Sequence, residues 1–289
     1  MWERRTDLVL ERQESADVGA LAGVKSSVRR QGPLQITDIT VLNEQGARAL
    51  GKPPGRYLTA ELPAGAAEGR ENLFACAETL AVLLRPLLPE SGAVLTAGLG
   101  NRAVTPDALG PETLSNLIVT RHLIAAMPET FGGMRPVCAV ACGVLGDTGV
   151  ETGELLRGVV DRIKPAAVVA VDALCARSLE RLCRAFQLSD TGIVPGSGAC
   201  NPRRALNEAT LGVPVIALGV PTVVEARTLC ADLVPEGKAP ACPLPHEGLL
   251  VTPKDIDRQV ALCGKILGYA LNLALQRDMT AAEMEAYLG

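Results

Sequence analysis

The segment Ala166-Ala167-Val168-Val169-Ala170-Val171 is apolar at every position, and Asp172 follows it directly. A strand that exposes one face to water alternates apolar with polar residues, whereas a strand buried on both faces does not. Three more short runs have the same character, at 93–97, 136–141 and 213–218. We therefore predict a sheet of parallel strands that is covered on both faces.

Segments with helical spacing lie between these runs. Within residues 71–88, Leu73, Cys76, Leu80 and Leu84 recur three or four positions apart, which places them on one face of a helix. The alternation of strands and helices predicts a three-layer α/β/α arrangement with helices on both faces of the sheet. The predicted helices span residues 71–88, 112–127, 152–163, 174–186 and 252–276, and Thr252 is the predicted N-cap of the last one.

Two regions depart from this alternation. Residues 1–70 are typical of a charged arm followed by irregular strands. Residues 233–249 contain four prolines and two glycines, which predicts a loop. We interpret residues 1–289 as a single α/β/α domain that includes both regions.

Composition narrows the class of protein. The 289 residues are 48% hydrophobic and 2% aromatic, so aliphatic side chains must fill the core. The formal net charge of −4 argues against a direct nucleic-acid partner, and no apolar stretch is long enough to predict a membrane span. The nine cysteines are scattered and odd in number, which indicates reduced thiols in the cytoplasm. They show no zinc-ligand spacing, so we expect no metal.

Two aspartates follow strand-like runs at the predicted carboxyl edge of the sheet. Asp172 follows 166–171, and Asp107 lies in the loop that follows 93–97. Ligands bind outside the carboxyl ends of the strands in open parallel sheets. Burial raises the pKa of a carboxyl group, and a second carboxylate raises one pKa of the pair further, so such a pair supplies both a base and an acid. An aspartate at this position is also a common helix N-cap, and this alternative stays open for each residue.

Glycine-rich loops follow the same strands. Their backbone N–H groups are suited to stabilise a developing oxyanion, but such loops are equally typical of plain turns. The sequence lacks the third glycine of a dinucleotide-binding loop, the lysine of a P-loop and the G-x-S-x-G motif of serine hydrolases. The loop residues that we consider as support for the site are Gly98, Gly100, Asn101, Gly143, Gly146 and Ser197.

Many short segments, in order along the chain, resemble the germination protease family of spore proteases. The resemblance is specific because it is carried by many segments. These segments are Arg5-Thr6-Asp7-Leu8, Gly55-Arg56-Tyr57, Gly98-Leu99-Gly100-Asn101, 105–111, Thr120-Arg121-His122, 143–152, Val171-Asp172-Ala173-Leu174, 189–198, 211–224 and 250–254.

The resemblance implies a mostly parallel mixed sheet in an α/β/α fold similar to that of hydrogenase-maturation endopeptidases. It implies an endopeptidase that degrades small acid-soluble spore proteins during germination, with Asp107 and Asp172 as its two essential aspartates and no cofactor. It also implies a zymogen that cleaves itself between Asp7 and Leu8, so that residues 1–7 form a short propeptide. Such proteins are expected in the spore core as tetramers.

This sequence departs from the family pattern at several places. Only four residues precede Arg5, and the region between Val224 and Leu250 is shorter than in typical members. Cysteines follow alanines at Ala141-Cys142 and Ala199-Cys200, where the family usually has other residues. Two other functions therefore stay open as alternatives: a metal-reading endopeptidase of the hydrogenase-maturation type, and a non-catalytic binding module on the same fold. A phosphate or nucleotide binder is a third.

Overall fold

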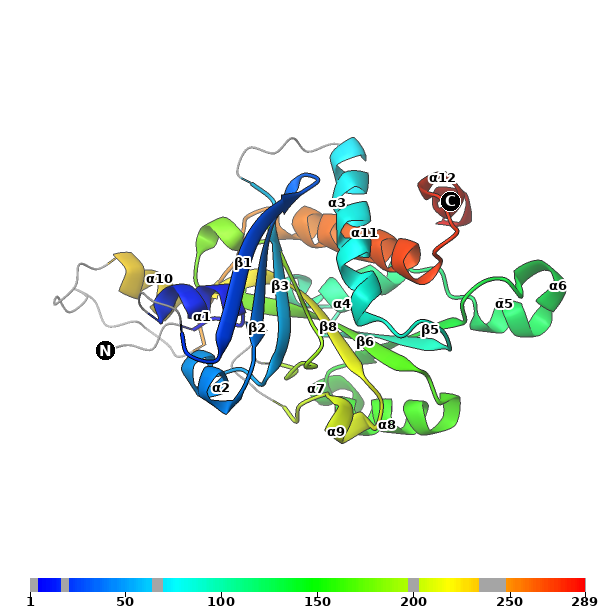
Figure 1. Cartoon of the computed structure of the whole chain (residues 1–289), viewed down its shortest axis with the longest axis horizontal. Coiled ribbons are helices and arrows are strands. Elements are labelled where there is room, and N and C mark those ends of the chain that lie inside the picture. Colours follow the sequence, from blue (N-terminus) through cyan, green and yellow to red (C-terminus); the bar gives the residue numbers. More distant parts are fainter. Residues whose placement is uncertain (1–4, 17–20, 64–69, 197–202, 234–247, 289) are drawn as a thin grey trace.

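A mixed β-sheet forms the centre of the protein in the computed structural model, which describes residues 5–16, 21–63, 70–196, 203–233 and 248–288. In these ranges the strand order is β1-β2-β3-β7-β8-β6-β4-β5, and β9 pairs with β8 outside this path (Figure 1). The strands are β1 Val24–Gln31, β2 Leu34–Val41, β3 Gly55–Glu61, β4 Val94–Leu99, β5 Val137–Gly143, β6 Ala167–Ala176, β7 Ala185–Ser189, β8 Val215–Glu225 and β9 Leu250–Val251.

The strands predicted from continuous apolar runs are β4, β5, β6 and β8, and they pair in parallel. All the other ladders within the described ranges are antiparallel. The mixed α/β sheet is therefore confirmed, with a larger antiparallel part than the sequence suggested. The reason lies in the first 70 residues, where β1, β2 and β3 form a regular antiparallel ribbon in place of irregular strands.

Helices cover both faces of the sheet, as Figure 1 shows. On one face, α3 (Arg70–Leu84), α4 (Leu109–Ser115) and α11 (Ile256–Leu275) pack on one another and on the strands. On the other face lie α8 (Thr152–Ile163) and α9 (Glu208–Leu211). The remaining helices are α1 Val9–Ser15, α2 Glu44–Leu50, α5 Arg121–Ala126, α6 Pro128–Phe131, α7 Leu145–Thr148, α10 Ala226–Leu233 and α12 Ala281–Leu288, with short 3-10 turns η1 Arg85–Leu87, η2 Thr105–Asp107 and η3 Leu179–Arg181.

The alternation of side chains along β6 explains why its sequence is apolar throughout. Val169 and Val171 point into the core beneath α3 and α11, while Val168 and Ala170 join the core beneath α8. Successive residues of a strand face opposite sides, so a strand covered on both sides needs an apolar residue at each position. This confirms the three-layer arrangement predicted from residues 166–171.

Two predicted helices are wrong. Residues 112–127 do not form one helix, because α4 ends at Ser115 and α5 begins only at Arg121. Residues 174–186 do not form a helix either, because β6 continues to Ala176, where it is still paired with β8, and β7 begins at Ala185. In both places the pairing of apolar residues with distant elements outweighs local helical spacing.

Two further boundaries differ from the prediction. The C-terminal helix begins at Ile256, four residues later than predicted, because Thr252 donates a hydrogen bond from its hydroxyl to the carbonyl oxygen of Thr222 at 2.8 Å instead of capping a helix. Most of the predicted loop 233–249 lies outside the described residues; its first residue ends α10.

The break between α4 and α5 depends on Asn272 of α11, whose side chain is 1% exposed. Its Oδ1 accepts from the backbone N–H of Ile118, and its Nδ2 donates to the carbonyl oxygen of Asn116, both at 2.9 Å. We predict that Asn272→Ala lowers the free energy of unfolding by about 1–3 kcal/mol, because it leaves buried main-chain groups without partners. Urea unfolding measures the change. Ala261→Ser, on the exposed face of the same helix, is the control, and an equal effect of both variants would contradict this role.

Candidate active site

Asp172 is the sixth of the ten residues of strand β6, just past its middle. The sequence placed it at the end of a strand, which is wrong, because β6 stays paired with β8 beyond it, with Asp172 opposite Gly219. On the other edge, however, β4 pairs with β6 only as far as Val171. Asp172 is therefore the first residue past the point where β4 leaves, at the carboxyl end of the parallel part of the sheet, where ligands bind in folds of this kind.

Asp107 reaches the same place from the loop that follows β4. It ends the 3-10 turn η2, and its Oδ2 accepts a hydrogen bond from the backbone N–H of Asn101 at 2.8 Å. Gly100 makes this geometry possible. Its φ is +94°, and a Cβ at this position would lie 2.0 Å from the carbonyl oxygen of Asp107. A residue with a side chain is excluded there by both the backbone conformation and the contact.

The two aspartates line one cavity of about 310 Å³. The hydroxyl of Thr222, on β8, donates to the carbonyl oxygen of Pro106 at 2.7 Å and so ties the Asp107 loop to the sheet. The residues around the cavity are Val104, Pro106, Asp107, Asp172, Ala173, Leu174, Gly196, Thr222, Val223, Leu250 and Thr252. The walls are thus largely apolar, with two carboxyl groups and two hydroxyl-bearing residues.

Burial makes Asp172 a strong candidate for a protonated carboxyl group. Asp172 is only 4% exposed to solvent. Burial is the largest cause that raises its pKa well above the usual value, and the nearby carboxylates of Asp107 and Asp7 raise it further, against hydrogen bonds from the N–H groups of Ala173 and Gly196. Burial also raises the pKa of Asp107, although the Asn101 N–H opposes this. A buried proton donor beside a more accessible carboxylate is an arrangement that serves general acid–base chemistry.

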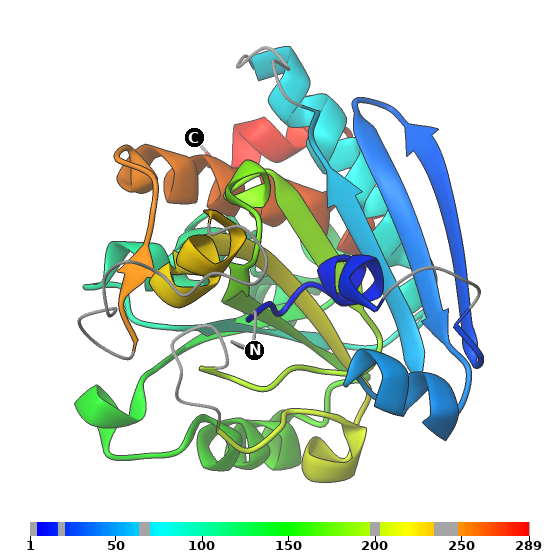
Figure 2. The same cartoon turned by 90° about the vertical axis from the view of Figure 1, so that its left-hand side faces the viewer.

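The predicted processing site lies against the same end of the sheet. Asp7 and Leu8 are 6% and 0% exposed. The Asp7 N–H donates to the carbonyl oxygen of Cys175, and the Cys175 N–H donates to Asp7 Oδ2, both at 2.9 Å. The side chain of Leu8 packs with Leu174 and Ala176 of β6. In Figure 2, α1 (dark blue), which follows directly, lies beside this end of the sheet with α10 (gold) next to it.

Of the residues predicted as support, those that the structure describes do not line the cavity: Gly98, Gly100, Asn101, Gly143 and Gly146. Gly98 and Gly100 lie behind the cavity. A Cβ on Gly98, in β4, would lie 2.8 Å from the backbone of Gly110 in α4, so this glycine permits close packing of the strand against the helix. Gly143 ends β5 and Gly146 lies in α7. These loops are joined where Asn101 Nδ2 donates to Asp147 Oδ2 at 3.1 Å. Ser197 lies outside the described residues.

Sequence reasoning missed three of the groups that line the cavity. Gly196 contributes a backbone N–H to Asp172, and the signal was the glycine-rich loop that contains it. Thr222 follows a recognised apolar run, but nothing marked its hydroxyl as part of a site. Thr252 was interpreted as a helix cap, whereas its hydroxyl binds the main chain of Thr222.

Neither a metal cluster nor a membrane helix is found in the part of the chain that the structure describes. Within the described ranges no group of three or more His, Cys, Asp or Glu side chains could hold a metal ion. Among those same residues, no helix is both long and apolar enough to cross a membrane.

Comparison with known proteins gives one family. A model of the germination protease family matches residues 4–235. The germination protease of Clostridium perfringens is 38% identical over 326 aligned positions that cover 100% of both chains. That of Caldanaerobacter subterraneus is 42% identical over 98% of each chain, and that of Bacillus subtilis is 45% identical over 80% of this chain and 66% of the relative. Both aspartates and the segment around Asp7 fall within the matched range.

One solved structure shows a distant likeness. A NiFe hydrogenase maturation protease, HycI, from Thermococcus kodakarensis matches 65% of this chain and 98% of its own, at 16% sequence identity and a TM-score of 0.39.

The raised pKa of Asp172 predicts how stability depends on pH. The folded protein binds a proton at Asp172 more tightly than the unfolded chain, whose aspartates titrate near pH 4. The stability that this proton contributes is complete below about pH 4 and is lost as the pH rises toward the raised pKa. We predict that the free energy of unfolding of the wild type, minus that of Asp172→Asn, decreases with pH over this window. Urea unfolding across about pH 4 to 8 measures it, and a difference that grows with pH would contradict the prediction.

Proposed function

The chain belongs to the germination protease family and is a protease of spore germination, and on this premise we propose that it is an endopeptidase that uses Asp107 and Asp172 to degrade small acid-soluble spore proteins. The observation that carries the proposal is the meeting of the two carboxyl groups in one cavity at the carboxyl end of the parallel strands. They are 65 positions apart in the sequence, so the fold alone brings them together. The proposed site of action is the spore core, where such substrates occur.

The proposed reaction assigns a different task to each carboxyl group. Asp107, the more accessible of the two, takes a proton from a water molecule as the water oxygen bonds to the carbonyl carbon of the substrate. Asp172, protonated because it is buried among carboxylates, gives its proton to the nitrogen of the leaving amine as the C–N bond breaks. The two products are a carboxylic acid and an amine, and one water molecule is consumed. The apolar walls of the cavity favour this division, since they keep Asp172 neutral.

We also propose that the protein is made as a zymogen and cleaves its own chain between Asp7 and Leu8. The support is the position of this bond: Asp7 is bound to the main chain of Cys175, three residues beyond Asp172, and its carboxylate is close enough to raise the pKa of Asp172. An acidic residue before the cleaved bond is also what the resemblance implies for substrates. Residues 1–7 would then leave as a short propeptide.

We predict that Asp107→Asn and Asp172→Asn each slow the cleavage of a purified small acid-soluble spore protein by at least about 100-fold, because an amide neither accepts nor delivers the required proton. Gel-based assays of the intact substrate measure the rate. Asp161→Asn, on the exposed face of α8 where Asp161 pairs with Arg157 at 3.1 Å, is the matched control and keeps full activity. Activity in both single variants at the wild-type level would contradict the assignment.

The same assay separates the alternatives. Cleavage that persists in the presence of a metal chelator supports the aspartate pair. Cleavage that stops with the chelator and returns with a divalent metal supports the metal-reading alternative. A folded wild-type protein that binds the spore protein without cleaving it supports the binding module.

We predict that the purified full-length chain loses residues 1–7 on incubation, so that intact-mass analysis and N-terminal sequencing find Leu8 as the new first residue. Asp172→Asn is expected to keep its original N-terminus, because it lacks the proton donor. Asp7→Ala is expected to be processed more slowly, because the Cys175 N–H loses its acceptor. A new N-terminus at another position, or equal processing of Asp172→Asn, would contradict the proposal.

A further inference from the structure

Gln187 of β7 contacts both sides of the bond that the proposed function would cut. Its side-chain Nε2 donates to the carbonyl oxygen of Asp7 at 3.2 Å. Its Oε1 accepts from the backbone N–H of Val9 at 2.7 Å. The carbonyl oxygen of Asp7 belongs to the Asp7–Leu8 peptide bond itself. The Gln187 side chain therefore binds the carbonyl oxygen of this bond and also the N–H of Val9, one residue beyond Leu8.

The register of the sheet places Gln187 and Asp172 on the same face. Gly219 of β8 lies opposite Gln187 on one side and opposite Asp172 on the other. Residues in one row across neighbouring strands point their side chains to the same face. Gly219 has no side chain, and Leu174 covers it so closely that a Cβ there would lie 2.6 Å from the Leu174 side chain. Leu174 therefore covers the position between Gln187 and Asp172, and Leu8 packs with Leu174 on the same face of the sheet.

The segment that packs on this face contains the Asp7–Leu8 bond. Asp7 is bound to Cys175 on β6, and Val9 is bound to Gln187 on β7, so the bond runs from one strand toward the other. Leu8 lies between them with its side chain against Leu174. An oxygen that gains negative charge during attack on this bond would already have a hydrogen-bond donor.

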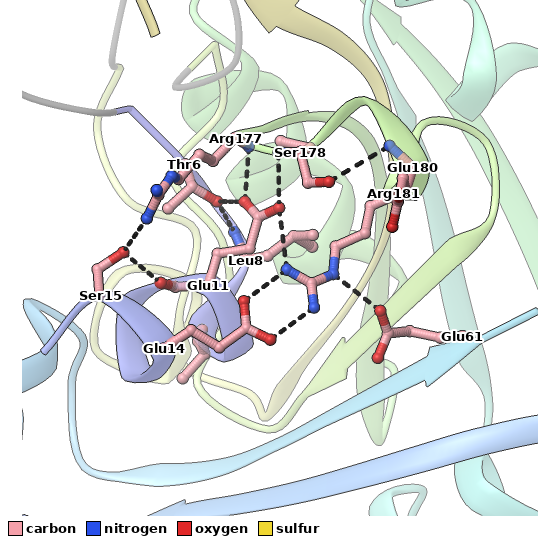
Figure 3. Close-up of polar contacts among 12 residues, drawn as sticks. Thr6, Leu8, Glu11, Glu14, Ser15, Glu61, Arg177, Ser178, Glu180 and Arg181 are labelled. Carbon is pink, nitrogen blue, oxygen red and sulfur yellow. Dashed lines mark hydrogen bonds and ion pairs between the residues drawn. The ribbon is translucent and has the colours of Figure 1, made fainter. Parts of the chain in front are cut away.

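A second contact network keeps this segment in register, and Figure 3 shows it. Glu11, on α1, is 1% exposed and accepts from the backbone N–H groups of Arg177 and Ser178, at 2.6 Å and 2.9 Å. The Glu11 carboxylate also accepts a hydrogen bond from the Thr6 hydroxyl and forms an ion pair with the guanidinium of Arg181 at 3.3 Å.

Arg181 joins three elements at this point. Its guanidinium pairs with Glu11 and with Glu14 of α1, the latter at 2.6 Å, and with Glu61 of β3 at 2.8 Å. Its side chain is 16% exposed, so solvent screens these pairs only partly. The start of α1, two residues after the Asp7–Leu8 bond, is thus fixed to the turn after β6 and to β3. This fixed position keeps the Val9 N–H and the Asp7 carbonyl within reach of the Gln187 amide.

We propose that Gln187 is the oxyanion donor for cleavage of the Asp7–Leu8 bond. This inference rests on the self-processing put forward under the proposed function. As Asp107 takes a proton from the water and the water oxygen bonds to the Asp7 carbonyl carbon, the π electrons of the C=O bond move to the oxygen, and the Nε2–H of Gln187 donates to the resulting oxyanion. When the C–N bond then breaks, the carbonyl re-forms and the Leu8 nitrogen takes the proton that Asp172 supplies. Gln187 itself neither gains nor loses a proton.

The test compares the first-order rate of self-processing in full-length variants. Gln187→Glu keeps the length of the side chain and an acceptor for the Val9 N–H, but it replaces the N–H donor with an oxygen. Loss of one such donor slows reactions of this kind by about 100- to 1000-fold, and we expect a decrease of that size. Gln187→Met, which removes the donor without adding a charge, is expected to give a similar loss. Intact-mass analysis over time measures the rate, at a temperature at which circular dichroism shows each variant folded.

Gln276→Glu is the matched control. Gln276 is a buried amide that, like Gln187, binds the main chain through both its oxygen and its nitrogen: it accepts from the Arg135 N–H and donates to the Arg135 carbonyl oxygen, both at 2.9 Å, and it does not line the cavity. A purely structural role of Gln187 predicts that both glutamate variants lose stability and process at the same rate.

The outcomes are distinct. Slow processing of both Gln187 variants with normal processing of Gln276→Glu supports the inference. Wild-type rates in folded Gln187→Glu or Gln187→Met overturn it and leave the proposed processing intact. A wild-type chain that does not cut itself between Asp7 and Leu8 overturns the proposed processing, and the inference with it.

Discussion

The site depends on a difference in length between the two ladders of strand β6. The ladder with β4 ends at Val171, whereas the ladder with β8 continues to Ala176. The main chain just beyond Val171 therefore has a strand on one edge only, and unpaired backbone groups in a buried position need partners from elsewhere. Asp172 bonds the N–H of Ala173, and Asp7 bonds both main-chain groups of Cys175. Because β4 pairs with β6 only as far as Val171, the edge of β6 beyond Val171 provides both the position of Asp172 and a place where the extended segment around Asp7 binds.

The two sides of the Asp7–Leu8 bond are attached by different kinds of contact. The preceding residues are held mainly by hydrogen bonds to main chain and hydroxyl groups, as at Cys175 and Thr228. The following residues are held by the burial of Leu8 and by the carboxylate of Glu11. This carboxylate accepts hydrogen bonds from two backbone N–H groups and forms an ion pair with Arg181. Removal of one partner from a buried ion pair is strongly destabilising, so α1 is costly to detach. After a cut at this bond, α1 would remain attached through Leu8, Glu11 and Arg181.

The sequence was most informative where burial dictates residue type, and least informative where long-range pairing decides. The run 166–171 predicted a strand covered on both faces because such a strand favours apolar residues at successive positions. The same reasoning failed at 174–186, since the apolar residues Leu174 and Cys175 fit a helix as well as they fit a continuing strand, and only the partner β8 decides between them. Gln187 carried no signal, because its meaning depends on Gly219 and on residues near the N-terminus, which are about 180 positions away. The two aspartates were predicted because both follow strand-like runs and match the family pattern, whereas their shared cavity is a property of the fold.

The position of Asp7 links the leader to the protonation of Asp172. Burial raises the pKa of Asp172 whether or not the leader is present, but part of the increase comes from the Asp7 carboxylate. If residues 1–7 leave, that contribution is lost, and the proton on Asp172 is bound less tightly than in the uncut chain. A substrate with an acidic residue before its scissile bond would restore a carboxylate to the same place, where the Cys175 N–H is free to receive it. Such a substrate would raise the pKa of Asp172 again and so keep it protonated, and a preference for acidic residues at this position would follow from electrostatics near Asp172 as well as from the hydrogen bond itself.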